Sequence, residues 1–178
     1  MNIKTRLLIC TVAITCGIAG IALATPIVGL NFNNILAFGT INTEVLDRAR
    51  VALPLVVGQE REREEEDNDW SAKLSTSGPS NFIVLDGSYF PGGHTGWHSH
   101  PGILLLTVTE GSIEWYNSNC EKTVYNVGDS LTENTQVHYF RNVGSVNARV
   151  MATFVIAKGQ PRRIDQPAPA CATALGLY

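Results

Sequence analysis

The second half of the chain, from Asn81 to Lys158, is a series of short apolar runs separated by turn residues. β-branched and aromatic residues dominate eight segments, which predicts strands at FIVLDGSYF, GWHSH, ILLLTVT, SIEWYN, KTVYNV, DSLTE, VHYFRN and ARVMATFVIA. A strand with its turn repeats every roughly 8–12 residues, which is typical of an all-β sandwich or barrel. This half has no helical period and no nucleotide-binding glycine loop.

The first 24 residues have the three-part pattern of a secretory signal peptide. Lys4 and Arg6 precede an uncharged run from Leu7 to Ala24, and this run ends in the small-x-small sequence Ala-Leu-Ala. An uncleaved membrane anchor is the alternative, because about 18 apolar residues can just span a bilayer. We expect cleavage after Ala24, no stable membrane association afterwards, and a secreted or periplasmic location.

Changes of texture along the chain predict four regions. They are a signal peptide over 1–24, an extended and charged N-terminal segment over 25–69, a barrel over 70–160, and a Pro/Ala-rich tail over 161–178. A short helix is expected near Thr43–Arg50, and the run QEREREEEDND at 59–69 is typical of a solvated loop. The formal net charge of −3 and the lack of a basic cluster argue against a nucleic-acid partner.

Export changes what the cysteines mean. Cys120 and Cys171 remain in the predicted mature chain, in a compartment where thiols oxidise. A disulfide between them would tie the C-terminal tail to a hairpin of the barrel and stabilise the fold by roughly 3–4 kcal/mol on the chain-entropy model. A metal or redox pair is the alternative, although neither cysteine lies in a CxxC arrangement.

Three of the four histidines fall within seven residues. His98 and His100 are two residues apart, so on a strand they project from the same face. His138 begins a later predicted strand, which in a closed barrel can lie opposite the first. Three neutral imidazoles are a ligand set for zinc, and they also suit other transition metals. We therefore expect the side chains of His98, His100 and His138 to bind one divalent metal ion, which could be Fe, Zn, Mn, Cu or Ni.

The residues around these histidines resemble the two sequence motifs of the cupin superfamily. GGHTGWHSHPG with TEGSIEWY is similar to the first motif, G(X)5HXH(X)3–4E(X)6G, and GDSLTENTQVHYFRN is similar to the second, which ends in H(X)3N. The matching residues are Gly93, His98, His100, Gly111, Gly128, His138 and Asn142. The resemblance covers nearly half the chain and implies a small all-β cupin barrel, a double-stranded β-helix or jelly roll. The PGGxTGWHSHPG opening also looks like a group of secreted single-domain cupins.

The chain departs from the cupin motifs where a carboxylate ligand is usual. Leu104 and Leu105 stand where the first-motif glutamate should fall, so the resemblance implies a three-histidine site without a carboxylate. We expect Glu133 to face water and Glu114 to point outward from an alternating strand. An alternative interpretation is a barrel without metal, in which the histidine rings are satisfied polar groups of the core.

His94 and Asn142 are possible accessory residues. His94 lies in a glycine-rich loop at the expected barrel mouth, either as an exposed loop histidine or as a proton shuttle or extra ligand. Asn142 either orients a ligand histidine or satisfies backbone groups in a turn. Four aromatic side chains are expected to belong to the core or to line the pocket: Trp97, Trp115, Tyr139 and Phe140.

These features predict an exported metal-binding cupin, and three functional hypotheses follow. The first is a metal-dependent oxygenase that acts on a small molecule, by fold-level analogy with three-histidine thiol dioxygenases of the cupin superfamily. The second is a non-catalytic extracytoplasmic module that binds a small ligand such as a sugar. The third is a scaffold for association, since cupins commonly dimerise through their sheets, so a homodimer is also expected. Whether the protein is an enzyme stays open at this point.

Overall fold

The computed structural model describes residues 24–51 and 70–178. The predicted signal peptide up to residue 23 and the charge run at 59–69 lie outside the described residues. The elements, in chain order, are β1 (Val28–Ile41), β2 (Val45–Val51), β3 (Trp70–Thr76), β4 (Ser80–His94), β5 (His98–Ser99), β6 (Gly102–Glu110), β7 (Ser112–Asn117), β8 (Lys122–Asn126), β9 (Ser130–Glu133), β10 (His138–Arg141), β11 (Ala148–Ala157), β12 (Ile164–Asp165) and α1 (Ala172–Leu175).

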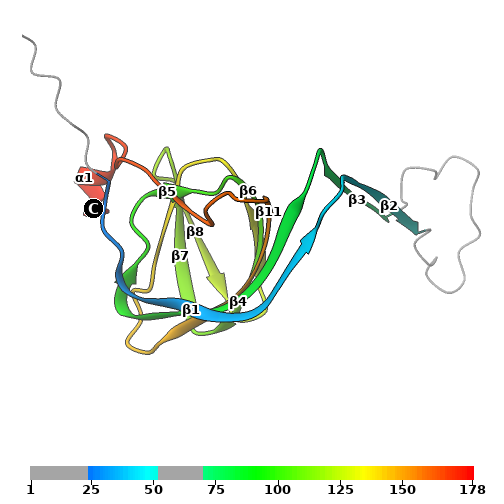
Figure 1. Cartoon of the computed structure of the whole chain (residues 1–178). Helices are drawn as coiled ribbons and strands as arrows, with labels where there is room; N and C mark the ends of the chain where they lie inside the picture. The colour runs from blue at the N-terminus through cyan, green and yellow to red at the C-terminus, as the bar shows by residue number, and fades with distance from the viewer. Residues whose placement is uncertain (1–23, 52–69) are drawn as a thin grey trace, which may run out of the picture.

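One curved antiparallel sheet wraps into a nearly closed barrel (Figure 1). Among the described residues this sheet has ten strands, and its main path runs β12-β5-β10-β4-β11-β6-β9. β1 pairs with β4, and β7 joins β10 to β8. The all-β barrel expected from the sequence is therefore confirmed.

The alternation of apolar side chains along β4 and β11 builds the inside of the barrel. Successive side chains of a strand face opposite sides, and burial alternates in step along both strands. One cluster of buried side chains surrounds Tyr89 and Phe140, and a second surrounds Leu85 and Phe154. Because full burial of one such side chain contributes roughly 1.5–3 kcal/mol, these clusters are the main source of the barrel's stability.

The N-terminal part of the described chain adds a strand to the barrel and then leaves it. β1 runs along β4 from the pair Val28–His94 to the pair Ile41–Ser80. β2 and β3 form a separate hairpin, which projects away from the barrel (Figure 1). The prediction of a short helix near Thr43–Arg50 is wrong. Val45–Val51 is strand β2, and each of its residues pairs with a residue of β3.

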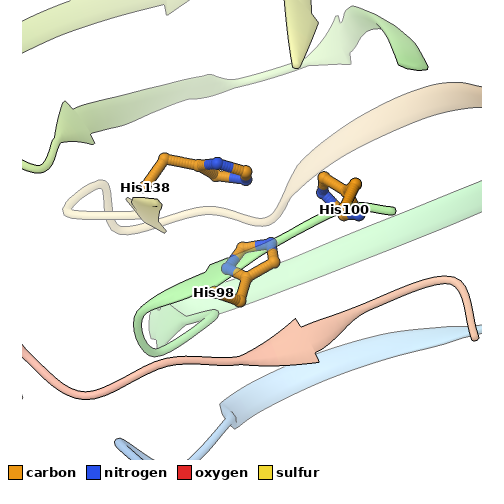
Figure 2. A group of neighbouring side chains, drawn as sticks. All are labelled: His98, His100 and His138. Atoms are coloured by element: carbon orange, nitrogen blue, oxygen red, sulfur yellow. The ribbon is translucent and has the colours of Figure 1, made fainter. Parts of the chain in front are cut away.

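Strand pairing brings the two histidine segments together. β5 lies beside β10, and His98 stands directly opposite His138 in that pairing (Figure 2). Gly96 shapes the turn before β5. Its φ of +65° is in the left-handed region, and a Cβ there would lie 2.4 Å from the carbonyl oxygen of Thr25. A side chain at this position would therefore displace the segment that carries His98.

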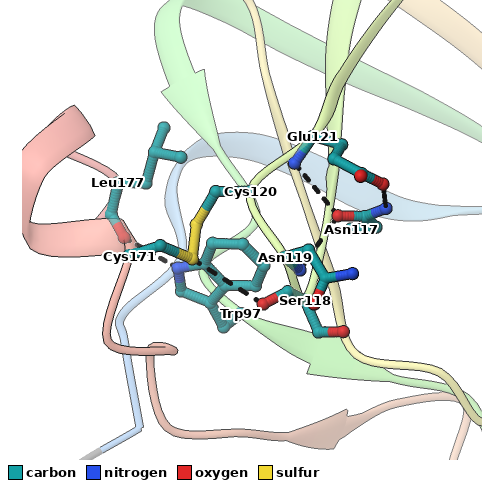
Figure 3. Close-up of a disulfide and its surroundings, with 8 residues drawn as sticks. All are labelled: Trp97, Asn117, Ser118, Asn119, Cys120, Glu121, Cys171 and Leu177. Atoms are coloured by element: carbon teal, nitrogen blue, oxygen red, sulfur yellow. Dashed lines mark hydrogen bonds between the residues drawn. A yellow bond between two sulfur atoms is a disulfide. The ribbon is translucent and has the colours of Figure 1, made fainter.

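The C-terminal tail is fastened to the barrel at two places (Figure 3). The predicted disulfide between Cys120 and Cys171 is present. Leu177 is fully buried, and its carbonyl oxygen accepts a hydrogen bond of 2.7 Å from the indole Nε1 of Trp97. The tail, expected to be irregular, contains β12 and the short helix α1. None of the helices in the described residues has the length and apolar character needed to cross a membrane.

Removing the disulfide should lower stability because the unfolded chain gains freedom. The two cysteines are 51 residues apart, and closing a loop of that length stabilises the folded state by about 4 kcal/mol on the chain-entropy model. The double variant C120S/C171S should therefore unfold at a lower urea concentration than the oxidised protein. Addition of a reductant should lower the unfolding midpoint of the parent protein and leave that of the variant unchanged. Equal unfolding midpoints, or two free thiols in the denatured mature protein, would contradict the assignment.

Glu114 of β7 is the centre of a polar network that joins β7, β8 and β10. Its carboxylate accepts hydrogen bonds from Arg141 Nε at 2.7 Å, the Tyr116 hydroxyl at 2.7 Å and Lys122 Nζ at 2.8 Å. Glu114 lies across the strand from the core residue Ile113, as alternation predicts, yet it is only 8% exposed. Burial alone would raise the pKa of Glu114, but these hydrogen bonds outweigh it and lower the pKa to about 2.

This network should make stability depend on acid pH. The pKa of Glu114 is about 2 in the folded protein and about 4.5 without the network, so its contribution is complete above pH 4.5 and is lost as the pH falls toward 2. We expect Glu114→Gln to lower the free energy of unfolding by on the order of 2 kcal/mol at neutral pH, because a buried charged hydrogen-bond network is broken. Urea unfolding at several pH values measures the difference, which should shrink toward pH 2. Glu110→Gln is the control because Glu110 forms an exposed ion pair, and an equal loss in both variants would refute the prediction.

Candidate metal centre

Three buried histidine side chains converge inside the barrel (Figure 2). His98, His100 and His138 each offer one ring nitrogen, and these three atoms lie within 4.8 Å of one another. All three residues are at most 4% exposed. The structure therefore brings together the three histidines that sequence spacing predicted.

Backbone carbonyl groups fix the orientation of all three rings. Each ring uses Nδ1 for one hydrogen bond: His98 to Gly96 O at 3.1 Å, His100 to Arg162 O at 2.7 Å, and His138 to Gln136 O at 2.8 Å. Because a carbonyl oxygen only accepts, Nδ1 carries the proton in each ring. A neutral ring of this tautomer has its lone pair on Nε2, which is the form that binds a metal.

The Nε2 atoms of His100 and His138 are buried, and no described residue forms a hydrogen bond with either. Burial lowers the pKa of His98 well below its usual value, and the positive charge of Arg163 lowers it further. In their neutral form the three rings present Nε2 lone pairs that a metal ion can accept.

A buried carboxylate adds a fourth group. Glu133, at the end of β9, is 4% exposed, so the expectation that it faces water is wrong. Its Oε1 lies 2.9 Å from Nε2 of His138, and its Oε2 lies 3.3 Å from Nε2 of His100, but neither contact has hydrogen-bond geometry. Burial would raise the pKa of Glu133, and the two rings lower it to about 2 when they carry a positive charge. A metal ion bound at the Nε2 atoms would supply the same positive charge, so the site places a carboxylate beside its ring nitrogens.

Strand pairing explains why the sequence analysis missed Glu133. Leu104 of β6 stands at the motif position of the usual glutamate, and in the structure Glu133 of β9 is directly opposite Leu104. The carboxylate thus comes from the neighbouring strand. A local signal existed, since Leu131 packs against the core and Glu133, two residues later, shares its face of the strand. Nε1 of Trp115 donates to Oε1 of Glu133 at 3.2 Å and helps to hold the carboxylate.

The two possible accessory residues lie outside the convergent group. The His94 ring stacks on Tyr139 with 5.4 Å between ring centroids. Asn142 satisfies backbone groups: its Nδ2 donates to the carbonyl oxygens of Tyr89 and Val146, and its Oδ1 accepts from the Gly144 amide. In this structure Asn142 stabilises the turn after β10, the second of the two roles considered for it.

The cluster borders a cavity of about 300 Å³ inside the barrel. His98, His100 and Glu133 line this cavity together with mainly apolar side chains: Ile27, Leu30, Phe32, Leu85, Leu104, Leu106, Phe140, Ala152 and Phe154. Of the four aromatic residues considered above, Phe140 lines the cavity, whereas Trp97 and Tyr139 pack into a separate core with Leu177. The cavity has the size and character of a small-molecule site.

The donor set fits a divalent metal ion. Three imidazole nitrogens and a carboxylate suit Zn, Fe, Mn, Cu or Ni. Buried lone pairs beside a buried negative charge are unfavourable without a compensating positive charge. A cation bound by the three Nε2 atoms would supply that charge and satisfy the ring nitrogens, so the residues present fit a metal.

The fold and the histidine cluster together define the class of this barrel. A family model described as Cupin domain matches residues 81–156, which include all three histidines and Glu133. This part of the chain is therefore a cupin domain and belongs to the cupin superfamily.

Solved structures include similar barrels. One is an uncharacterized conserved protein with a double-stranded β-helix domain from Klebsiella pneumoniae, with 27% identity and a TM-score of 0.41, covering 47% of this chain and 73% of that chain. Another is a cupin-like protein from Thermotoga maritima, with 23% identity and a TM-score of 0.41, covering 49% of this chain and 65% of that chain. Comparison with curated proteins finds no match.

Substitution of the convergent histidines should abolish metal binding. We expect about one metal ion per chain in the purified protein, and its loss in His98→Ala and in His138→Ala, because each change removes one nitrogen ligand. Glu133→Gln should weaken metal binding by about tenfold or more, because the negative charge is removed. Elemental analysis and competition with a chelator measure both effects.

His94→Ala is the matched control, because it removes a histidine outside the cluster and should keep the metal. Retention of metal in both cluster variants would refute the assignment, and so would its loss in the control.

Proposed function

We propose that this chain is an exported metal-dependent oxygenase that acts on a small molecule inside the barrel. The observation that carries the proposal is the convergence of His98, His100, His138 and Glu133 beside an apolar cavity. The ring protons are already committed to backbone carbonyl groups, so the free nitrogens are set for metal binding rather than for proton transfer.

Each group of the site has a separate task. The three histidines would hold the metal through Nε2, and Glu133 would offset part of its positive charge, with its carboxylate oriented by Trp115. When bound, a redox-active metal supplies a Lewis acid and a centre at which dioxygen can be activated. The protein fixes the position of the substrate and excludes water from it.

The composition of the cavity wall supports metal-based chemistry. Within the described chain, the lining includes no Asp, Lys, Ser or Cys, and Glu133 is its one carboxyl group. The hydroxyl of Thr95 lines the cavity but already donates to the Gly96 carbonyl oxygen and accepts from the Phe140 amide, so it is held in the backbone and not free as a nucleophile. Tyr89 also lines the cavity. Burial raises the pKa of Tyr89 well above its usual value, and the charge of Glu133 raises it further, so the hydroxyl keeps its proton and can donate to a substrate.

Two observations support export. The N-terminal 24 residues have the pattern of a signal peptide, and the Cys120–Cys171 disulfide belongs to an oxidising compartment. Cell fractionation of the full-length chain tests this part, with N-terminal sequencing of the mature protein to test cleavage after Ala24.

Oxygen consumption tests the catalytic part. The mature protein, loaded separately with Fe(II), Mn(II), Cu(II) or Ni(II), should consume dioxygen in step with the loss of one member of a panel of small thiols, enols and aromatic diols. We expect His98→Ala to lower this rate by about a hundredfold or more, since it removes a metal ligand, and His94→Ala to keep it. Binding of a panel compound without oxygen uptake would instead favour the non-catalytic binding module.

A further inference from the structure

Two arginines line the same cavity as the histidine cluster. Arg162 and Arg163 precede β12, and both belong to the cavity wall. The carbonyl oxygen of Arg162 accepts the hydrogen bond from Nδ1 of His100, and Asp165 of β12 pairs with His98 of β5. The segment that carries the arginines is thus tied to two of the metal-site histidines, which gives their side chains a defined position beside the site.

Arg163 is incompletely paired. Its Nε donates to Asp165, whose side chain is 58% exposed. Its Nη2 is buried and has no hydrogen-bond partner within residues 24–51 and 70–178. A buried donor without an acceptor costs roughly 1–3 kcal/mol, so an acceptor supplied by a ligand would be strongly favoured at this atom.

Arg163 shares the cavity wall with Tyr89 and His98. Burial raises the pKa of Tyr89, and the positive charge of Arg163 opposes that rise. The guanidinium therefore belongs to the same pocket as the Tyr89 hydroxyl and the metal-site ring of His98.

The balance of charges in the cavity favours an anion. Glu133 is the one acidic side chain among the lining residues described, whereas Arg162 and Arg163 contribute two positive charges before any metal is counted. The charge of Arg163 is shared with Asp165, which lies outside this lining and is exposed. Arg162 donates from Nη1 to the carbonyl oxygen of Phe32 on β1 at 3.4 Å, and it has no ion pair with a carboxylate of the described residues. The remaining wall is mostly apolar, so a small, strongly hydrated anion would leave much of it uncontacted.

We infer that the ligand of this site is a small apolar carboxylate, bound through its carboxylate to Arg163 with its hydrocarbon part against Leu104, Leu106 and Phe154. This inference deepens the proposed function and rests on it for the reaction, but the carboxylate site itself depends on Arg163 and not on turnover. A guanidinium suits this role because its planar N–H groups match the two oxygens of a carboxylate.

The test compares acids with their neutral amides. Benzoate, benzamide, hexanoate, hexanamide and inorganic phosphate are titrated calorimetrically into the mature full chain, both metal-free and loaded with Zn(II). We expect each carboxylate to bind about tenfold or more tightly than its amide, because a charged hydrogen-bonded pair with Arg163 adds that much affinity. Arg163→Gln should remove this preference by weakening carboxylate binding while leaving amide binding unchanged, and Arg163→Lys should keep part of it.

Arg149→Gln is the matched control. Arg149 pairs with Asp86 and Glu110 and is absent from the cavity wall, so the preference should persist in this variant. Circular dichroism and the unfolding temperature establish that each variant is folded. Equal binding of acid and amide by the parent, an undiminished preference in Arg163→Gln, or tighter binding of phosphate than of benzoate would overturn the inference.

Metal content measured on the same samples separates the two proposals. A protein that binds benzoate through Arg163 but holds no metal refutes the oxygenase and supports the carboxylate site. A protein that holds metal but shows no preference for acids refutes the carboxylate site and leaves the metal function intact.

Discussion

The hydrogen bonds from three histidine Nδ1 atoms to backbone carbonyl oxygens are the constraint on which the site depends. Each bond fixes both the tautomer and the direction of its ring, so the lone pairs of His98, His100 and His138 face a shared space. The acceptors are main-chain atoms, and they cannot move without disturbing the strands and turns around them. The arrangement is therefore a property of the barrel and not of three independent side chains.

The barrel supplies those acceptors from separate parts of the chain. Gly96 and Gln136 lie two residues before the histidines that they orient, whereas Arg162 is distant in sequence and reaches His100 because β12 pairs with β5. This last contact links the C-terminal segment to the site. The Cys120–Cys171 disulfide and the burial of Leu177 fix the remainder of that segment against the barrel. The disulfide and the buried Leu177, both far from the site, thus help to hold the segment that orients the His100 ring.

The carboxylate of the site comes from a strand other than the one that carries the first cupin motif. Leu104 occupies the usual glutamate position of the first cupin motif, and Glu133 enters the same space from the strand paired with it. The carboxylate beside the imidazole nitrogens thus comes from β9 and not from β6. The apolar face that Leu104 gains then contributes to the cavity wall. The pairing of Leu104 with Glu133 accordingly shapes both the set of possible metal ligands and the wall of the cavity.

The sequence alone determined the features that depend on neighbouring residues. A period of two predicted the strands and placed His98 and His100 on one face, the cupin motifs added His138, and the cysteine count pointed to Cys120 and Cys171. The tertiary structure decided the features that depend on register between distant strands. It placed Glu133 opposite Leu104, tied Arg162 to His100, and made residues 45–51 a strand paired with β3 instead of a helix. The physical reason is that strand alternation is local, whereas the partner that faces a residue is set by hydrogen bonds between segments that no short-range pattern relates.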